Sequence, residues 1–147
     1  MQTGSYENAY YIMNNAPLDL KRRMLIYSTS KEKSETISQH KQSSDTILVG
    51  PTLCEGIDFP DDQCRFIVVM KVPYPSLADK LVKAKMKLFP RWYSSKTSNA
   101  IIQGLGRGIR HKTDWCKSYI LDGCFARLLN ETYEQYPEEM RKRFIRV

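Results

Sequence analysis

One stretch of this 147-residue chain is more informative than any other: Gln103-Gly104-Leu105-Gly106-Arg107-Gly108-Ile109-Arg110. On a helix each residue advances about 100°, so Gln103, Arg107 and Arg110 would fall within about 60° of one another. That face would carry one amide and two guanidinium groups, and a guanidinium offers a planar fork of donors that matches a phosphate. Three glycines cost such a helix about 1 kcal/mol each relative to alanine. Their presence predicts close backbone packing or a loosely wound turn beside a ligand.

A dinucleotide-binding loop is the first alternative for this stretch, because Gly104-Leu105-Gly106 begins like G-x-G-x-x-G. Ile109 stands where the third glycine would be, and no predicted strand directly precedes the motif, so this alternative fails. A solvated helix that merely exposes two arginines remains an open alternative.

Around this stretch, apolar segments alternate with polar, helix-like segments. This alternation predicts an α/β fold, with a mainly parallel sheet flanked by helices, and the length fits a single domain. The expected strands are residues 24–28, 46–49, 65–72 and 116–121; the expected helices are residues 5–14, 31–41 and 125–135, one from an N-cap at Ser76 towards Phe89, one from an N-cap at Ser98 towards Arg110, and a last one opened by Pro137.

A second informative segment is Thr52-Leu53-Cys54-Glu55-Gly56-Ile57-Asp58-Phe59. It follows a predicted strand, so it is expected at the carboxyl edge of the sheet, where open α/β sheets bind ligands. Gly56 permits an unusual backbone angle, and Glu55 and Asp58 flank it with polar groups. Taken alone, the segment is as compatible with a simple turn as with a binding site.

Charge and composition narrow the function classes further. The net charge of +7 favours a polyanionic partner, namely nucleic acid, nucleotide phosphates or an anionic membrane, although a merely basic surface stays open as an alternative. Hydrophobic residues make up 41% and charged residues 27%, as in ordinary globular proteins. The longest apolar run, Phe66 to Met70, is far shorter than the ~20 residues that span a bilayer, and the first residues lack the features of a signal peptide. We therefore expect a soluble intracellular protein, cytoplasmic or nuclear.

The cysteines do not suggest a metal site. They stand at positions 54, 64, 116 and 124, without a C-x-x-C pair, and neither His40 nor His111 lies near them at zinc-finger spacing. Buried, reduced thiols are the expected state, and no metal is expected in this chain.

Together these segments resemble a known family. Gln103-x-x-Gly106-Arg107-x-x-Arg110 resembles motif VI of superfamily-two helicases, and Glu55-Gly56-Ile57-Asp58-Phe59 resembles motif V in the form used by the DinG and XPD branch. Leu25 to Ser30 is similar to motif IV, a strand followed by small hydroxyl residues. Val72 to Pro75 and Tyr119 to Asp122 also resemble that branch, in the same order, so that the resemblance covers about residues 24–125.

The resemblance implies that residues 1–147 form a single RecA-like domain, the carboxyl-terminal motor half of a DinG/XPD-type ATP-dependent DNA helicase. In that family ATP lies in the cleft between this domain and a first RecA-like domain. Arg107 and Arg110 would reach the γ-phosphate, and Gln103 would position the phosphate or the attacking water. The remaining roles implied are coupling of nucleotide to DNA by Glu55, Gly56 and Asp58, and contacts to the single-strand backbone by Thr29, Ser30 and Thr52.

The rest of the catalytic machinery is not in these 147 residues. No G-x-x-x-x-G-K-[ST] occurs to cradle the phosphates, and no Asp-Glu pair of the D-E-x-H kind is present to hold Mg²⁺. ATP and Mg²⁺ are therefore expected to be bound mainly by an N-terminal RecA-like domain that carries the P-loop, and this chain alone is expected to be inactive. The alternative from another class is a stand-alone nucleic-acid-binding module without an ATPase role.

Overall fold

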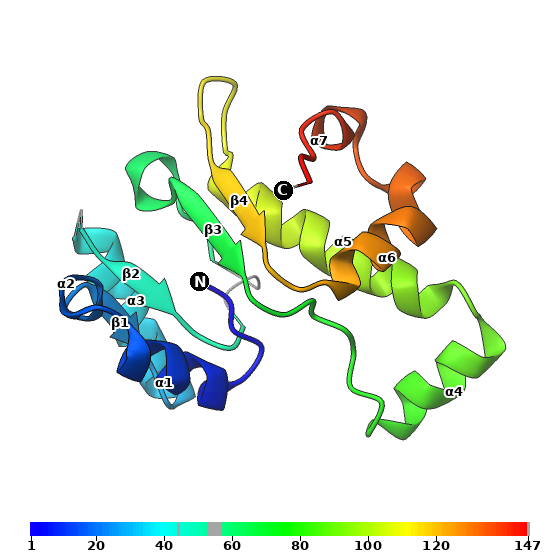
Figure 1. Cartoon of the computed structure of the whole chain (residues 1–147), viewed down its shortest axis with the longest axis horizontal. Coiled ribbons are helices and arrows are strands. Elements are labelled where there is room, and N and C mark those ends of the chain that lie inside the picture. The colour runs from blue at the N-terminus through cyan, green and yellow to red at the C-terminus, as the bar shows by residue number, and fades with distance from the viewer. Residues whose placement is uncertain (44, 53–56, 147) are drawn as a thin grey trace.

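The computed structural model describes residues 1–43, 45–52 and 57–146. It confirms the predicted α/β fold, with parallel strands flanked by helices (Figure 1). The strands are β1 (Met24–Ile26), β2 (Ile47–Val49), β3 (Phe66–Val69) and β4 (Lys117–Ile120); the helices are α1 (Tyr6–Asn15), α2 (Leu18–Lys21), α3 (Ser30–Gln42), α4 (Lys80–Leu88), α5 (Trp92–Leu105), α6 (Cys124–Thr132) and α7 (Glu138–Arg141); the 3₁₀ turns are η1 (Asp61–Gln63), η2 (Gly106–Gly108) and η3 (Tyr133–Gln135).

The sheet has two parallel pairs that the amino-terminal residues join. β1 pairs with β2, and β3 pairs with β4. Gln2 bridges both Gly50 and Val69 in the parallel sense, so residues 1–4 lie between β2 and β3 (Figure 1). The backbone amide of Gln2 donates to the Val68 carbonyl at 2.8 Å, and the amide of Thr3 donates to the Gly50 carbonyl at 2.9 Å. The sequence did not predict that this segment would join the two pairs.

Helices cover the β1–β2 pair on both faces, as the alternation of its side chains requires. Met24 and Val49 point to one face and pack against Ala9 of α1. Leu25 and Leu48 point to the other, where α3 and the segment after residue 56 cover them. The β3–β4 pair packs one face against α5 and α6, in a cluster centred on Val69, Val72, Ile101, Leu105, Leu128 and Tyr136.

Two predicted helix starts were wrong. Ser76 does not cap α4; Asp79 does, and its carboxylate accepts from the amides of Leu81 and Val82. Ser98 does not begin a helix, because α5 already starts at Trp92. Ser98 is instead buried in the middle of α5, where its hydroxyl lies 2.6 Å from that of Thr132.

The ends of these elements also differ in detail from the prediction. α5 stops at Leu105 and continues only as the η2 turn, so the predicted helix towards Arg110 is shorter than expected. The last helix, opened by Pro137, has a single turn. Within the described residues, no helix has the length and apolar character that crossing a membrane requires.

His40 gives the fold a pH-dependent element. Its ring lies 2.7 Å from the Thr46 hydroxyl, 3.3 Å from the Gln63 carbonyl and edge-on to Phe59. Burial lowers the pKa of His40 below its usual value, so folding favours the neutral ring. The unfolded chain then binds more protons in mild acid, and stability falls with decreasing pH.

We therefore expect the free energy of unfolding to decrease as the pH falls below about 6.5. Urea denaturation between pH 7.5 and 5 measures this decrease. In His40→Gln the decrease should be much smaller, whereas it should persist in His111→Gln, which alters an exposed histidine. An unchanged pH profile in His40→Gln would contradict this assignment.

Candidate functional site

Both arginines singled out by the sequence converge on one carboxylate. Arg107 lies in η2 and Arg110 in the segment after it, so they do not share a helix face as predicted. Even so, Arg107 Nη1 lies 3.0 Å from Asp58 Oδ1, and Arg110 Nη2 contacts the same oxygen. Arg107 Nη1 also donates to the Ile57 carbonyl at 3.4 Å. The structure therefore brings together the segments that resemble motifs V and VI.

This cluster is accessible to solvent. The exposed fractions are 27% for the Arg107 side chain, 34% for Arg110 and 59% for Asp58. Ion pairs at such a surface contribute little to stability, on the order of 0–1 kcal/mol. The guanidinium groups are therefore held in place by two weak ion pairs, and another anion could replace the Asp58 carboxylate in both.

Asp58 does not lie where the sequence predicted. It precedes β3, and both arginines precede β4, so the cluster lies at the amino-terminal ends of these parallel strands rather than at a carboxyl edge. Thr52 comes shortly after β2, whereas Asp58 comes shortly before η1 and β3. Glu55 and Gly56 fall outside the described residues.

Gln103 lies in the last turn of α5, where it is exposed. It takes no part in the ion pairs of Asp58. Its predicted role towards a phosphate or a water stays a prediction.

A buried carboxylate holds the backbone of Arg110. Asp114 Oδ2 accepts from the Arg110 amide at 2.9 Å, while Oδ1 accepts from the Trp115 amide and from Arg65 Nη1. Burial by itself raises the pKa of Asp114, but these hydrogen bonds outweigh it and the net pKa is lowered. Asp114 therefore stays ionised and fixes the start of the loop that follows Arg110.

Arg65 ties this loop to the start of β3. Its guanidinium contacts Asp62 as well as Asp114, donates to the Trp115 carbonyl at 2.9 Å, and lies 4.9 Å from the centre of the Trp115 ring. Sequence analysis missed Arg65 and Asp114. The signal that could have revealed Asp114 is a carboxylate in the polar turn just after Arg110, where the backbone amides need an acceptor.

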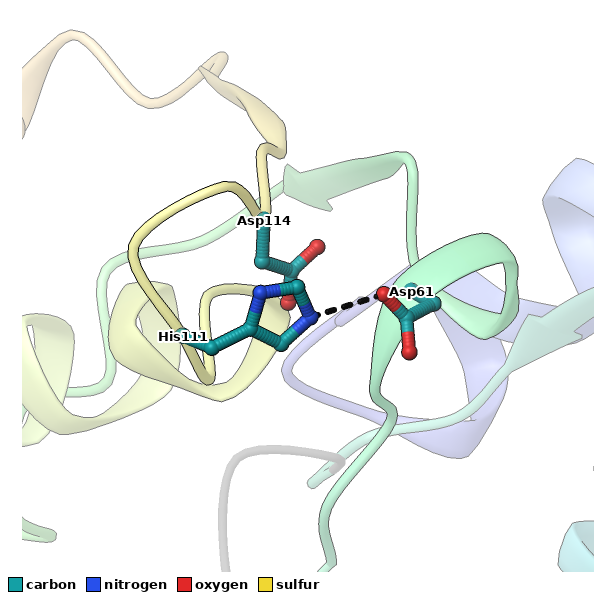
Figure 2. Close-up of side chains that lie close together, drawn as sticks. All are labelled: Asp61, His111 and Asp114. Carbon is teal, nitrogen blue, oxygen red and sulfur yellow. Dashed lines mark hydrogen bonds and ion pairs between the residues drawn. The ribbon is translucent and has the colours of Figure 1, made fainter.

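The same loop holds a cluster with metal-binding residue types, shown in Figure 2. Asp61, His111 and Asp114 each place one possible ligand atom within 4.8 Å of the others, and His111 Nε2 lies 2.9 Å from Asp61 Oδ1. However, both oxygens of Asp114 already accept hydrogen bonds, and Arg65 brings a positive charge to it. These contacts favour a structural role for the cluster, as a link between the turn before β3 and the loop before β4.

The glycines of the 103–110 stretch differ in how they pack. A Cβ at Gly108 would lie 2.7 Å from Cys116 Sγ, so the predicted close backbone packing occurs there. A Cβ at Gly106 would meet nothing within 4 Å. Of Gly106 and Gly108, only Gly108 therefore needs to be glycine on steric grounds.

A second group of predicted residues lies at the carboxyl ends of β1 and β2. Thr29 caps α3, with its hydroxyl accepting from the Glu32 amide at 3.2 Å, and is exposed. Ser30 is the first residue of α3. The Thr52 carbonyl accepts from the Tyr27 hydroxyl at 3.3 Å and from Lys33 Nζ at 3.2 Å.

Helix α1 begins at the same edge, after residues 1–4, which bridge Gly50 and Val69. Ser5 caps it and accepts from the Asn8 amide at 3.1 Å. Two helix N-termini with hydroxyl caps, at Ser5 and Thr29, therefore follow parallel strands at this edge. Such N-termini favour anions. The sequence predicted a helix over residues 5–14 but did not single out Ser5, because the position of residues 1–4 in the sheet was not predicted.

Comparison with known families identifies the class of protein that this fold and these motifs define. A family model described as the helicase C-terminal domain matches residues 3–143. The chain therefore belongs to the helicase C-terminal domain family, and its parallel α/β architecture is the RecA-like fold of that domain. The resemblance to the DinG and XPD branch is thereby confirmed.

Several individual relatives are helicases by name. The chain is 34% identical over 83 residues to the Fanconi anemia group J protein homolog of Gallus gallus, covering 48% of this chain and 7% of that protein. It is 32% identical over 88 residues to the ATP-dependent DNA helicase chl-1 of Caenorhabditis elegans, covering 54% and 11%. Regulator of telomere elongation helicase 1 of Homo sapiens is 32% identical over 88 residues, covering 49% and 7%. The matched segments thus span about a tenth or less of these relatives.

Proposed function

We propose that this chain is the second motor domain of an ATP-dependent DNA helicase and that it supplies Arg107 and Arg110 to the γ-phosphate of ATP. The observation that carries this proposal is the convergence of both guanidinium groups on the single oxygen Asp58 Oδ1. Two forks that meet at one anionic oxygen are already spaced to bind an oxygen of a phosphate. Because both arginine side chains are partly exposed, a ligand from another domain could reach that position and replace the Asp58 carboxylate.

The residues present in the chain indicate which steps of ATP hydrolysis it could support and which need a second domain. Catalysis of phosphoryl transfer rests on positioning and charge neutralisation, and an arginine finger can contribute about 10³–10⁵ in rate. The chain carries the arginines but no P-loop. ATP and its Mg²⁺ would therefore be bound mainly by an N-terminal RecA-like domain, which is the protein partner that the proposal requires.

Asp58 would couple the nucleotide to DNA. A phosphate oxygen that binds both Arg107 and Arg110 must displace the Asp58 carboxylate, because Asp58 Oδ1 now occupies the position between the two guanidinium groups. Asp58 belongs to the same predicted segment as Thr52, so we propose that the release of Asp58 alters the position of Thr52. Glu55 and Gly56 lie between these two residues and keep their predicted coupling role.

Single-stranded DNA would lie along the carboxyl ends of β1 and β2. Thr29, Ser30 and Thr52 stand at this edge, and Lys33 is anchored beside them on the Thr52 carbonyl. Hydroxyl groups, helix N-termini and a net charge of +7 suit the phosphate backbone, which supplies most of the sequence-independent affinity.

The testing experiment compares ATP turnover of the chain alone with turnover after a P-loop-bearing first domain is joined to it or added separately. We expect no turnover from the chain alone, and turnover that single-stranded DNA stimulates when both domains are present. DNA binding by the chain without turnover in either case would favour a stand-alone nucleic-acid-binding module. Turnover by the chain alone that Arg110→Ala abolishes would contradict the proposal.

A further inference from the structure

Two cysteine thiols face each other beneath the arginine-bearing turn. Cys64 directly follows η1 and Cys116 directly precedes β4, so the two residues stand near the starts of the neighbouring strands β3 and β4. Their sulfur atoms are 3.9 Å apart although the residues are 52 positions apart in sequence. Both are free thiols and half-buried. A disulfide needs about 2.05 Å between the sulfurs, so an approach of about 2 Å would close the bond.

The backbone of the turn rests directly on these sulfurs. A Cβ at Gly108 would lie 2.7 Å from Cys116 Sγ and 3.2 Å from Cys64 Sγ. Gly108 is buried and separates Arg107 from the segment that carries Arg110. If the distance between the two sulfurs changes, the packing beneath Gly108 changes, and with it the support of the turn that carries Arg107 and Arg110.

The surroundings of the two sulfurs favour Cys64 as the attacking thiolate and Cys116 as the resolving thiol. The hydrogen bond with the Cys116 thiol lowers the pKa of Cys64, an effect that burial opposes and that the nearby Arg65 guanidinium assists. The pKa of Cys116 is raised by the same hydrogen bond and by burial. Cys64 also lines a cavity of about 210 Å³, shared with Arg65 and Arg107, which gives a small oxidant a path.

We propose that Cys64 and Cys116 form a reversible disulfide when the protein meets a peroxide, and that this bond links the starts of β3 and β4 under the Arg107–Arg110 turn. The Cys64 thiolate attacks one peroxide oxygen, which breaks the O–O bond, leaves a sulfenic acid on Cys64 and releases hydroxide. The Cys116 sulfur then attacks the Cys64 sulfur and displaces water. In total, two thiols and one hydrogen peroxide give one disulfide and two waters.

The test is peptide mapping of the unsubstituted 147-residue chain after treatment with stoichiometric hydrogen peroxide. We expect a monomer that has lost two hydrogens, a single crosslinked peptide pair containing Cys64 and Cys116, and full reversal by dithiothreitol. The oxidised monomer should also unfold at a higher urea concentration than the reduced one, because the bond closes a long loop. Cys124→Ser, which removes an exposed thiol, should leave the crosslink unchanged, and Cys116→Ser should abolish it.

Three results would overturn the proposal: crosslinks that run mainly through Cys54 or Cys124, disulfide-linked dimers in place of the monomer, or a sulfinic acid on Cys64 without any crosslink. Mapping on the unsubstituted chain keeps the test independent of whether the serine variants fold. The result does not depend on ATP turnover, so it stands apart from the proposed motor function.

Discussion

In a protein that contains both motor domains, Arg110→Lys is expected to lower ATP turnover by about 10²–10³-fold, nearly as much as Arg110→Ala. Lysine keeps the positive charge but loses the planar fork, so it cannot bind two oxygens of a phosphate together. The structure adds a geometric reason, because the Arg110 and Arg107 side chains meet at one Asp58 oxygen. A flexible ammonium group would not hold that shared position. Steady-state turnover with saturating ATP and single-stranded DNA measures the effect.

The matched control is Arg127→Lys, on an exposed face of α6 where the side chain pairs only distantly with Glu131. It should leave turnover unchanged. Neither Arg110→Lys nor Arg110→Ala should shift the free energy of unfolding of the 147-residue chain by more than about 1 kcal/mol, because surface ion pairs contribute little. Near-normal turnover in Arg110→Lys, or an Arg110→Ala chain that no longer folds, would show that Arg110 has a structural role instead.

Gly50→Ala is expected to destabilise the chain by about 2–3 kcal/mol, as overpacking a well-filled core typically does. A Cβ at Gly50 would lie 2.6–2.7 Å from ring atoms of Tyr27. That ring is only 2% exposed and its hydroxyl is bound to the Thr52 carbonyl, so it cannot move aside freely. Gly50 also pairs with residues 1–4 at the centre of the sheet. Urea denaturation monitored by circular dichroism measures the loss.

Gly106→Ala is the control, since a Cβ there meets nothing within 4 Å and its φ of −67° suits alanine. Its stability should change by less than about 1 kcal/mol. In a Tyr27→Ala background, where the obstructing ring is gone, Gly50→Ala should cost clearly less, which a double-mutant cycle detects. An equal cost in both backgrounds would show that the ring is not the cause.

The sequence was sufficient for the fold class and for most elements, because a continuous apolar run such as Phe66–Met70 and a polar run such as 31–41 each indicate an element from local composition alone. It failed at Ser98, where an N-cap preference worth about 1 kcal/mol was outweighed by burial of the hydroxyl against Thr132. It also missed residues 1–4. Four residues are too few for a periodic signal, and their extended pairing depends on contacts with Gly50 on one side and with Val68 and Met70 on the other.

The site shows the same division between local and long-range information. Arg107 and Arg110 were singled out from the motif Gln103-x-x-Gly106-Arg107-x-x-Arg110, which is a local pattern. Their meeting with Asp58 joins residues about 50 positions apart, and no spacing rule predicts such a contact. Asp114 was missed for a related reason: its role depends on an ion pair with Arg65, which directly precedes β3 and is 49 positions away in the sequence.

The central position of residues 1–4 has a mechanical consequence. Their backbone is bonded along both edges, to Gly50 on one side and to Val68 and Met70 on the other. A pulling force applied along this strand acts on those hydrogen bonds in shear, all at once, rather than peeling them apart one by one. The same force is shared by the two halves of the sheet, so a force applied at residue 1 acts on the β1–β2 pair and on the β3–β4 pair together. A force applied at residues 1–4 therefore acts on both halves of the sheet at the same time.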